Sequence, residues 1–304
     1  MTKSFQRRFR YECLVLSLLA PFSAAHATAI VYEGFSDASG LTFAGDAATV
    51  STSDGVVSRI TPAAFGQSGA FYSTSAITLG GSDTFSTQFQ FRLSSPGGID
   101  PADGFTFVLA ASPAGLGGAG NGLGYVGVSN SVAIEFGTYN NYLGLGPYPA
   151  APNSSNHVAI DTDGVRTQTD VTNVYGVSSC GFTNGTPAQN PHTAAGCMSN
   201  GDLWTANITY DGNDLSVTLS DPAEGTSFTA LSDVPINISS YLGTNTAYVG
   251  FTGSTGSGWE NNDIVNWAFS NTANLPPDLI PEPSSLYLLG LGLVFLPLRY
   301  RARR

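Results

Sequence analysis

Positive charge is scarce along most of this 304-residue chain, and what there is lies mainly at the two ends. The chain has 11 Lys and Arg against 22 Asp and Glu, a net charge of −11. Between residues 28 and 280, only Arg59, Arg92 and Arg166 stand against 20 carboxylates. Because phosphate binding needs clustered cations, this composition excludes nucleic acid as a partner and disfavours an anionic membrane surface.

The first 27 residues have the pattern of an export signal. Basic residues within 3–10 precede an apolar run at 13–22, which is followed by Ala25-His26-Ala27, a small-x-small cleavage pattern. We expect residues 1–27 to be removed and the mature chain to begin near Thr28, outside the cytoplasm. Arg7-Arg8 leaves a twin-arginine signal as an alternative, although the flanking residues fit it poorly.

Cysteine is scarce too, with three in the chain, and Cys13 lies within the signal. Cys180 and Cys197 are therefore the pair left in the mature chain. In an oxidising compartment, two thiols 17 residues apart are expected to form a disulfide. A zinc site is disfavoured, because His192 lies between them but a fourth ligand is missing.

The last residues, 281–304, have the pattern of a second targeting signal. A Pro281-Glu282-Pro283 sequence precedes 13 apolar residues (286–298) and an arginine cluster that ends at Arg304. As a helix the apolar run rises about 20 Å, short of a hydrocarbon core of roughly 30 Å. Residues 281–304 resemble the PEP-CTERM sorting signals of bacterial exported proteins. That resemblance implies an exosortase as processing partner and a Gram-negative cell envelope or surface; a plain membrane anchor is the alternative.

Between these two terminal signals, β-rich segments follow one another so closely that no helix fits in the stretches that separate them. Each carries Val, Ile, Phe, Tyr, Trp or Thr at period two, and turn sequences such as Asp211-Gly212-Asn213 separate them. The pattern predicts one antiparallel β-sandwich over residues 28–271, with a linker at 272–280. No internal repeat points to a propeller or β-helix. The predicted strands are 29–32, 48–51, 56–60, 70–73, 84–92, 104–110, 132–136, 158–161, 203–210, 214–219, 247–252 and 263–269.

Several motifs in this region follow one another in a specific order. They are GQSGAFYST (66–74), FSTQFQFRL (85–93), ADGFTFVLA (102–110), GNGLGY (120–125), SVAIEFGTYNN (131–141), NHVAID (156–161) and VGFTGSTG (249–256), with NWAFS (266–270) closing the series. Together they resemble the L-type, or legume-lectin-like, lectins over nearly all of the mature chain. The resemblance implies a jelly-roll sandwich with a flat back sheet and a curved front sheet. It also implies a shallow sugar site beside a calcium ion and a transition-metal ion.

Each group that a sugar needs has a candidate in these motifs. A sugar binds through a carboxylate acceptor, an amide, loop N–H groups and an aromatic face. The resemblance implies that Asp103, after a cis Ala102–Asp103 peptide, is the carboxylate, that Asn141 is the amide and that Tyr139 is the ring. It places the loop N–H groups at Gly120, Asn121 and Gly122, although Asn121 stands where glycine is usual. The plainer alternatives are a turn aspartate, a loop-capping asparagine and a half-buried strand-end tyrosine.

At the metal site the sequence departs from the family. The resemblance makes Glu135, Tyr139, Asn141 and His157 the candidate ligands, but Gly137 stands where the first bridging aspartate is expected. The segment between Asn141 and His157 contains no carboxylate. Calcium prefers six to eight oxygens with carboxylates among them, so we expect no bound metal or other cofactor. Glu135 and His157 are then expected to form a hydrogen-bonded pair.

These residues favour an exported carbohydrate-binding protein whose ligand is a glycan or exopolysaccharide. A structural surface or biofilm-matrix protein that has lost the sugar site is the alternative. An enzyme is not expected, because retaining glycosidases need two close carboxylates and the positions around Glu135 on its strand hold Ser131, Ala133, Gly137 and Tyr139. The mature chain has two histidines, His157 and His192, and no G-x-S-x-G elbow between a strand and a helix.

Overall fold

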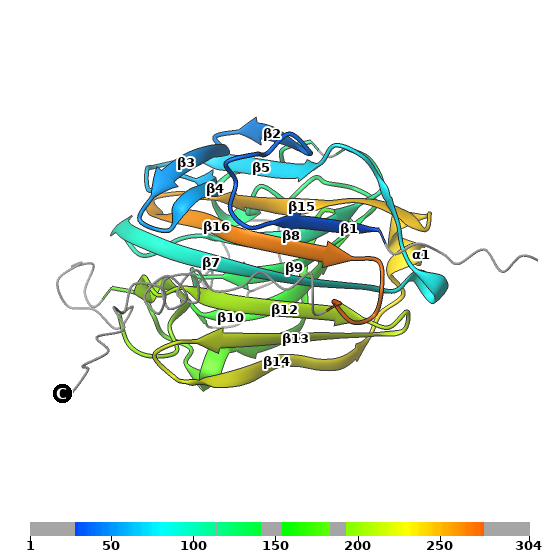
Figure 1. The fold of residues 1–304 in the computed structure, drawn as a ribbon. Helices are drawn as coiled ribbons and strands as arrows, with labels where there is room; N and C mark the ends of the chain where they lie inside the picture. The colour runs from blue at the N-terminus through cyan, green and yellow to red at the C-terminus, as the bar shows by residue number, and fades with distance from the viewer. Residues whose placement is uncertain (1–27, 114, 141–153, 183–192, 277–304) are drawn as a thin grey trace, which may run out of the picture.

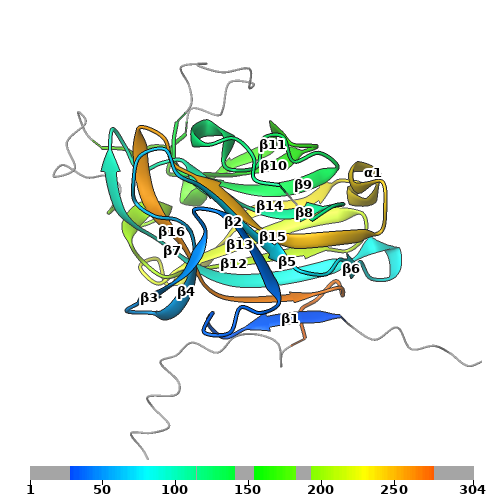
Figure 2. The same cartoon turned by 90° about the horizontal axis from the view of Figure 1, so that it is seen from above.

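The computed structural model describes residues 28–113, 115–140, 154–182 and 193–276. The proposed signal at 1–27, the tail at 281–304, Asn141 and His192 lie outside these residues. Two eight-stranded antiparallel sheets pack face to face (Figures 1 and 2), so the predicted all-β sandwich is confirmed. No helix among the described residues is long and apolar enough to cross a membrane.

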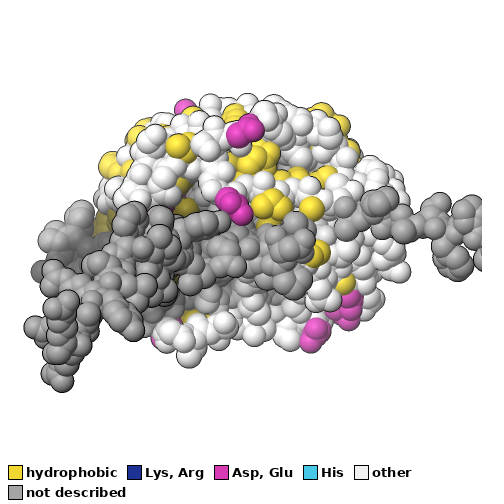
Figure 3. Space-filling view, viewed as in Figure 1, with side chains coloured by type: hydrophobic (Ala, Val, Ile, Leu, Met, Phe, Trp, Pro, Cys, Tyr) yellow, Lys and Arg dark blue, Asp and Glu magenta, His cyan; other side chains and the backbone are white. Residues whose placement is uncertain are grey.

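The sheet nearer the viewer in Figure 1 is built around β7 and β16, and we call it the β7 sheet. From one edge to the other its strands are β14 (Thr226–Pro235), β13 (Asp214–Asp221), β12 (Trp204–Tyr210), β7 (Phe85–Gly98), β16 (Gly258–Ser270), β4 (Gly55–Thr61) and β3 (Ala48–Thr52), with β1 (Ala29–Tyr32) paired to β16. Figure 3 views the molecule from the side of this sheet, where a few acidic side chains and several apolar ones are visible on the surface.

The second sheet, which we call the β9 sheet, carries the motifs of the expected site. Its strands run in the order β11 (Val165–Asn173), β10 (His157–Thr162), β9 (Ser131–Gly137), β8 (Gly104–Ala110), β15 (Thr246–Ser254), β5 (Ser68–Ser73) and β2 (Leu41–Gly45), with β6 (Ile77–Thr78) paired to β15. The described helices are short: α1 (Ile238–Leu242) and the single 3-10 turns η1 (Gly81–Asp83), η2 (Gly120–Gly122), η3 (Val174–Gly176) and η5 (Met198–Asn200).

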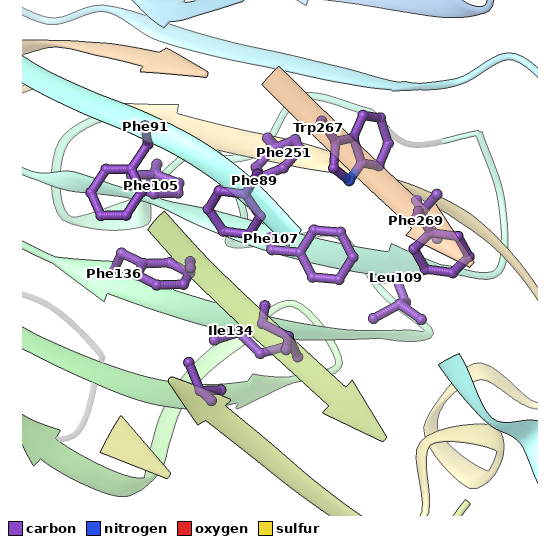
Figure 4. Close-up of a cluster of buried hydrophobic side chains, with 14 of the residues drawn as sticks. Phe89, Phe91, Phe105, Phe107, Leu109, Ile134, Phe136, Phe251, Trp267 and Phe269 are labelled. Carbon is purple, nitrogen blue, oxygen red and sulfur yellow. The ribbon is translucent and has the colours of Figure 1, made fainter. Parts of the chain in front are cut away.

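Aromatic side chains from both sheets fill the space between them (Figure 4). Phe89 of β7 lies with its ring centroid 4.9 Å from that of Phe251 and 5.6 Å from that of Phe136, both edge to face. Along β12 buried and partly exposed residues alternate strictly, as expected for a strand with one face on the core. The period-two pattern in the sequence of β12 therefore corresponds to the alternation of core-facing and outward-facing residues in this strand.

The β9 sheet differs because its central strands are covered on both faces. Every residue of β8 and β9 is buried, and a second apolar cluster lies on the outer face of these strands. Leu123, Tyr125 and Val128, from the loop that follows η2, pack there against Val108 and Ala133. This covering loop brings η2 to the end of the sheet where β8 begins and β15 ends, because Gly120 N–H donates to Thr255 O at 3.1 Å.

Cys180 and Cys197 are joined in the structure, with their Cα atoms 5.7 Å apart. The Asn156 side chain donates to the carbonyl of Val177, which precedes the disulfide-bonded segment, at 3.1 Å and to that of Gly196, which lies within it, at 2.8 Å. The Phe182 N–H donates to the Asp100 carboxylate. The disulfide-bonded segment is thereby attached to the rim of the site described next.

Candidate functional site

A cavity of about 260 Å³ opens where the start of β8, η2, the turn between β15 and β16, and the segment after β9 meet. Four of the predicted sugar-binding residues, Asp103, Gly120, Asn121 and Tyr139, line it together. Six other lining residues were not among the sequence candidates: Ile99, Ala102, Asn140, Gly256, Ser257 and Gly258. The VGFTGSTG motif (249–256) ends at the turn between β15 and β16, and the structure shows that residues 256–258 face Asp103.

Two of the sequence candidates are not at this cavity. Asn141 lies outside the described residues, so its predicted role stays a prediction. Gly122 is buried and is not among the lining residues, and its N–H donates to Ala119 O at 3.2 Å. Since the Gly120 N–H donates to Thr255, both of these loop N–H groups form hydrogen bonds within the protein.

Asp103 is held at the floor of the cavity by its backbone. Its N–H donates to Ser254 O at 3.0 Å, and its carbonyl accepts from Thr138 N–H at 3.2 Å. The Ala102–Asp103 peptide is cis. Gly104 follows with φ of +108°, and a Cβ there would lie 2.2 Å from Phe136 O, so glycine is required beside Asp103.

The Asp103 side chain is 6% exposed, and its Oδ2 atom has no hydrogen-bond partner among the described residues. Two glycines stand over it. A Cβ added to Gly256 would lie 3.3 Å from Oδ2, and one added to Gly120 would lie 4.0 Å from it. Because neither glycine has a side chain, their backbones close over the buried Oδ2 atom, while Asp103 itself contributes to the lining of the cavity.

Burial raises the pKa of Asp103 to about 7, although the charge of Arg166 offsets part of the rise. A second carboxyl group, Glu260, is fully buried behind the site and accepts a hydrogen bond from Thr138 Oγ1 at 2.6 Å. Burial also raises its pKa to about 7. One carboxyl group at the floor of the cavity and one buried behind it thus hold their protons up to about neutral pH.

Glu135 and His157, the expected metal ligands on neighbouring strands, contact each other directly. His157 Nε2 lies 3.0 Å from Glu135 Oε1, and both side chains are fully buried. The pKa of Glu135 is raised by burial, but Arg166 and His157 together hold it well below its ordinary value. Glu135 is therefore ionised.

The described residues at this position do not fit a metal ion. A Cβ on Gly137, where the family has an aspartate, would lie 2.4 Å from His157 Nε2 and 2.8 Å from Glu135 Oε1, so the imidazole fills the place of that side chain. Arg166 donates from Nε to Glu135 Oε2 at 3.2 Å and also binds Oε1 through Nη2. Within the described part of the chain, no group of three or more His, Cys, Asp and Glu residues is arranged to hold a metal.

Arg166 is the functional candidate that sequence reasoning missed. It is one of three arginines between residues 28 and 280, and each of the three pairs with a carboxylate: Arg59 with Asp263, Arg92 with Asp54 and Arg166 with Glu135. The sequence shows that a cation follows the NHVAID motif. It does not show that the side chain turns inward, where it is 2% exposed.

Comparisons with known proteins identify the family of this chain. Residues 27–284 match the family model of the legume lectin domain. The bark lectin of Styphnolobium japonicum is 29% identical over 201 residues, covering 62% of this chain and 62% of that protein. Lectin 9 of Medicago truncatula is 30% identical over 198 residues, covering 61% of each. The chain thus matches less than two thirds of the length of either relative.

Among solved structures, the basic winged bean lectin with Tn-antigen superposes with a TM-score of 0.61. It is 23% identical and covers 81% of this chain and 98% of its own. At that identity the likeness shows the shared jelly-roll fold, with two antiparallel sheets as described above. The family match extends over most of the sequence, and on that ground this chain belongs to the legume lectin domain family.

Proposed function

We propose that this protein is an exported lectin that binds a neutral glycan, without chemical conversion, in the cavity over Asp103. The observation that carries the proposal is the Asp103 carboxylate, which is almost fully buried, has one oxygen without a partner among the described residues, and faces a cavity lined by Tyr139. An unpaired buried acceptor costs free energy unless a ligand supplies its hydrogen bond.

The lining residues suit a sugar ring. A sugar hydroxyl can donate to the Asp103 carboxylate, while the apolar face of the ring packs against Tyr139 and the side chain of Ile99. A cavity of about 260 Å³ is small for a ligand site, which favours a single terminal sugar unit over a long chain. The buried carboxyl groups of Asp103 and Glu260 disfavour acidic saccharides.

We further propose that binding is noncovalent and independent of divalent metal, since Arg166 and His157 already satisfy the Glu135 carboxylate. The pattern of residues 1–27 supports export, and that of 281–304 supports exosortase processing at a Gram-negative cell surface. Extracellular polysaccharide would then be the glycan within reach. The printed titles of the relatives describe lectins, one of them with Tn-antigen bound, and they supply the class of ligand rather than its identity.

A structural surface protein without sugar binding is the second candidate. The observation in its favour is that the N–H groups of Gly120 and Gly122 already donate within the protein, so these two cannot donate to a sugar without rearrangement. Under this alternative the cavity would be a remnant of an ancestral site.

A glycan array separates the two candidates. The protein is applied to neutral and acidic saccharides at about pH 8 and about pH 6, one unit either side of the folded pKa of Asp103. We expect at least one neutral saccharide to bind. Since roughly nine tenths of Asp103 is ionised at the higher pH and one tenth at the lower, binding should weaken about tenfold on acidification.

Folding stability is expected to change with pH in the opposite direction to saccharide binding. Asp103 and Glu260 bind protons more tightly when folded, so the free energy of unfolding falls as pH rises from about 4 to about 7. Loss of fold therefore cannot account for weaker binding at about pH 6, which thermal unfolding at both pH values checks. Uniform absence of binding would favour the structural alternative, and stronger binding in acid would exclude Asp103 as the acceptor.

A further inference from the structure

We infer that the guanidinium group of Arg166 is a built-in cation that replaces metal ions in positioning the η2 loop at the cavity. Arg166 is thus a positioning residue that ties Glu135 of the β9 sheet to Asn121 of η2. The inference concerns the site for which a lectin function is proposed above, but its test uses no saccharide, so the two can fail separately.

The contacts of Arg166 are made along two edges of its planar guanidinium group. On one side Nε and Nη2 bind the two oxygens of the Glu135 carboxylate. On the other, Nη1 donates to the Asn121 backbone carbonyl at 3.0 Å and also contacts the Asn121 side-chain oxygen. A guanidinium presents five donors in a fixed plane, so it can join two sets of oxygens, whereas an ammonium group is a single point.

The charge of Arg166 is needed where it lies. Glu135 is fully buried, and Asp161 beside it on β10 is fully buried too. Gln168 Nε2 lies 3.3 Å from Glu135 Oε1, and His157 Nε2 lies 3.0 Å from the same oxygen. A buried carboxylate requires a compensating cation with good hydrogen-bond geometry, and Arg166 supplies it within the chain.

The same contacts occupy the coordination positions that a divalent ion would need at Glu135 and His157. Both Glu135 oxygens accept hydrogen bonds from protein groups, and His157 occupies the position of a side chain at Gly137. A metal ion there would also meet the positive charge of Arg166. The resemblance implies metal ions at this position, but here the side chain of Arg166 supplies the positive charge instead.

The consequence for the cavity follows from where Asn121 lies. Gly120 is joined to the end of β15 by its N–H, which donates to Thr255 O at 3.1 Å, and by its carbonyl, which accepts from Ser254 Oγ. Arg166 adds a second link, from the next residue, Asn121, to Glu135 on β9. These two attachments join η2 to two different strands of the β9 sheet, next to Asp103.

The test compares wild type with Arg166→Met and Arg166→Lys, and uses Arg59→Met as a matched control. Arg59 also pairs with a carboxylate, Asp263 at 2.7 Å, but on the β7 sheet. Two readouts are taken in chelator and in millimolar calcium or manganese: the midpoint of thermal unfolding, and the hydrogen–deuterium exchange of residues 117–124.

Wild type is expected to show the same unfolding midpoint in chelator, calcium and manganese. Arg166→Met should lower the midpoint by about 10 °C, because it leaves Glu135 buried without its cation, and should speed exchange of residues 117–124 at least tenfold. Arg166→Lys retains charge but cannot join both oxygen sets, so it should remain folded with faster exchange in this loop. Arg59→Met should leave exchange of the loop unchanged.

Stabilisation of wild type by calcium or manganese would overturn the inference, because the site would then hold an ion. Should Arg166→Met not fold, Arg166→Lys decides the question: loop exchange equal to that of wild type would show that the charge alone matters and that Arg166 does not position η2.

Discussion

Replacing Asp103 by Asn is expected to weaken binding of the saccharide selected on the array by at least about 100-fold. The substitution keeps the shape of the side chain but removes the ionised acceptor and can place an N–H₂ donor against the sugar hydroxyl. Hydrogen bonds to charged groups contribute about 1.5–3 kcal/mol each, so losing one or two of them corresponds to a loss of this size. Isothermal titration measures it directly.

Asp170→Asn is the matched control for this substitution. Asp170 is exposed on β11, away from the residues that line the cavity, and its φ of 54° is a conformation that Asn tolerates. Its affinity should equal that of wild type. If Asp103→Asn kept wild-type affinity while folding normally, the saccharide would not bind through this carboxylate, and the proposed site would be wrong.

Gly256→Val is expected to abolish binding by filling the cavity rather than by changing its chemistry. The new Cβ would lie 3.3 Å from Asp103 Oδ2 and 3.5 Å from the Gly120 Cα atom, so its methyl groups would occupy the space in front of the carboxylate. Gly256 is not among the glycines with positive φ, so the backbone accepts a side chain. We expect a loss of affinity of at least about 100-fold with a decrease in unfolding free energy of about 1–3 kcal/mol, because the neighbouring atoms must shift slightly.

The control for Gly256→Val is Gly81→Val, in the 3-10 turn η1. A Cβ on Gly81 meets nothing within 4 Å, and its φ is not positive, so the added bulk faces open space. Surface plasmon resonance on the immobilised saccharide should show binding by Gly81→Val and none by Gly256→Val. Equal binding by both variants would place the sugar elsewhere on the molecule.

The sequence predicted most strands but missed three of the four outermost strands of the two sheets; the fourth, β3, was predicted. The 29–32 and 104–110 predictions match β1 and β8 to the residue, and the other ten fall on strands with shifts at their ends. The strands without a prediction were β2, β6, β11 and β14. Of these, β2, β11 and β14 are edge strands and β6 has two residues, so each has fewer buried neighbours to impose an apolar alternation.

Part of the candidate site could be predicted from shared motifs, whereas the strands were predicted from their alternating pattern. Asp103 and Tyr139 lie in motifs that the family shares, so their place followed from the order of those motifs. Arg166 belongs to no such motif, and its inward orientation depends on Glu135, 31 positions earlier on another strand. The VGFTGSTG motif ends at Gly256, but the position of the turn at 256–258 over Asp103 depends on the pairing of β15 with β8. Contacts between distant segments decide these roles, and local patterns do not report them.

The central claim is that a neutral saccharide binds over Asp103 in a site that Arg166, rather than a metal, holds together. Titration of the array-selected saccharide into wild-type protein, once after exhaustive dialysis against chelator and once with calcium and manganese restored, tests it most directly. We predict the same dissociation constant in both conditions, to within about twofold, which corresponds to about 0.4 kcal/mol. Binding that disappears in chelator and returns with either ion would contradict the account.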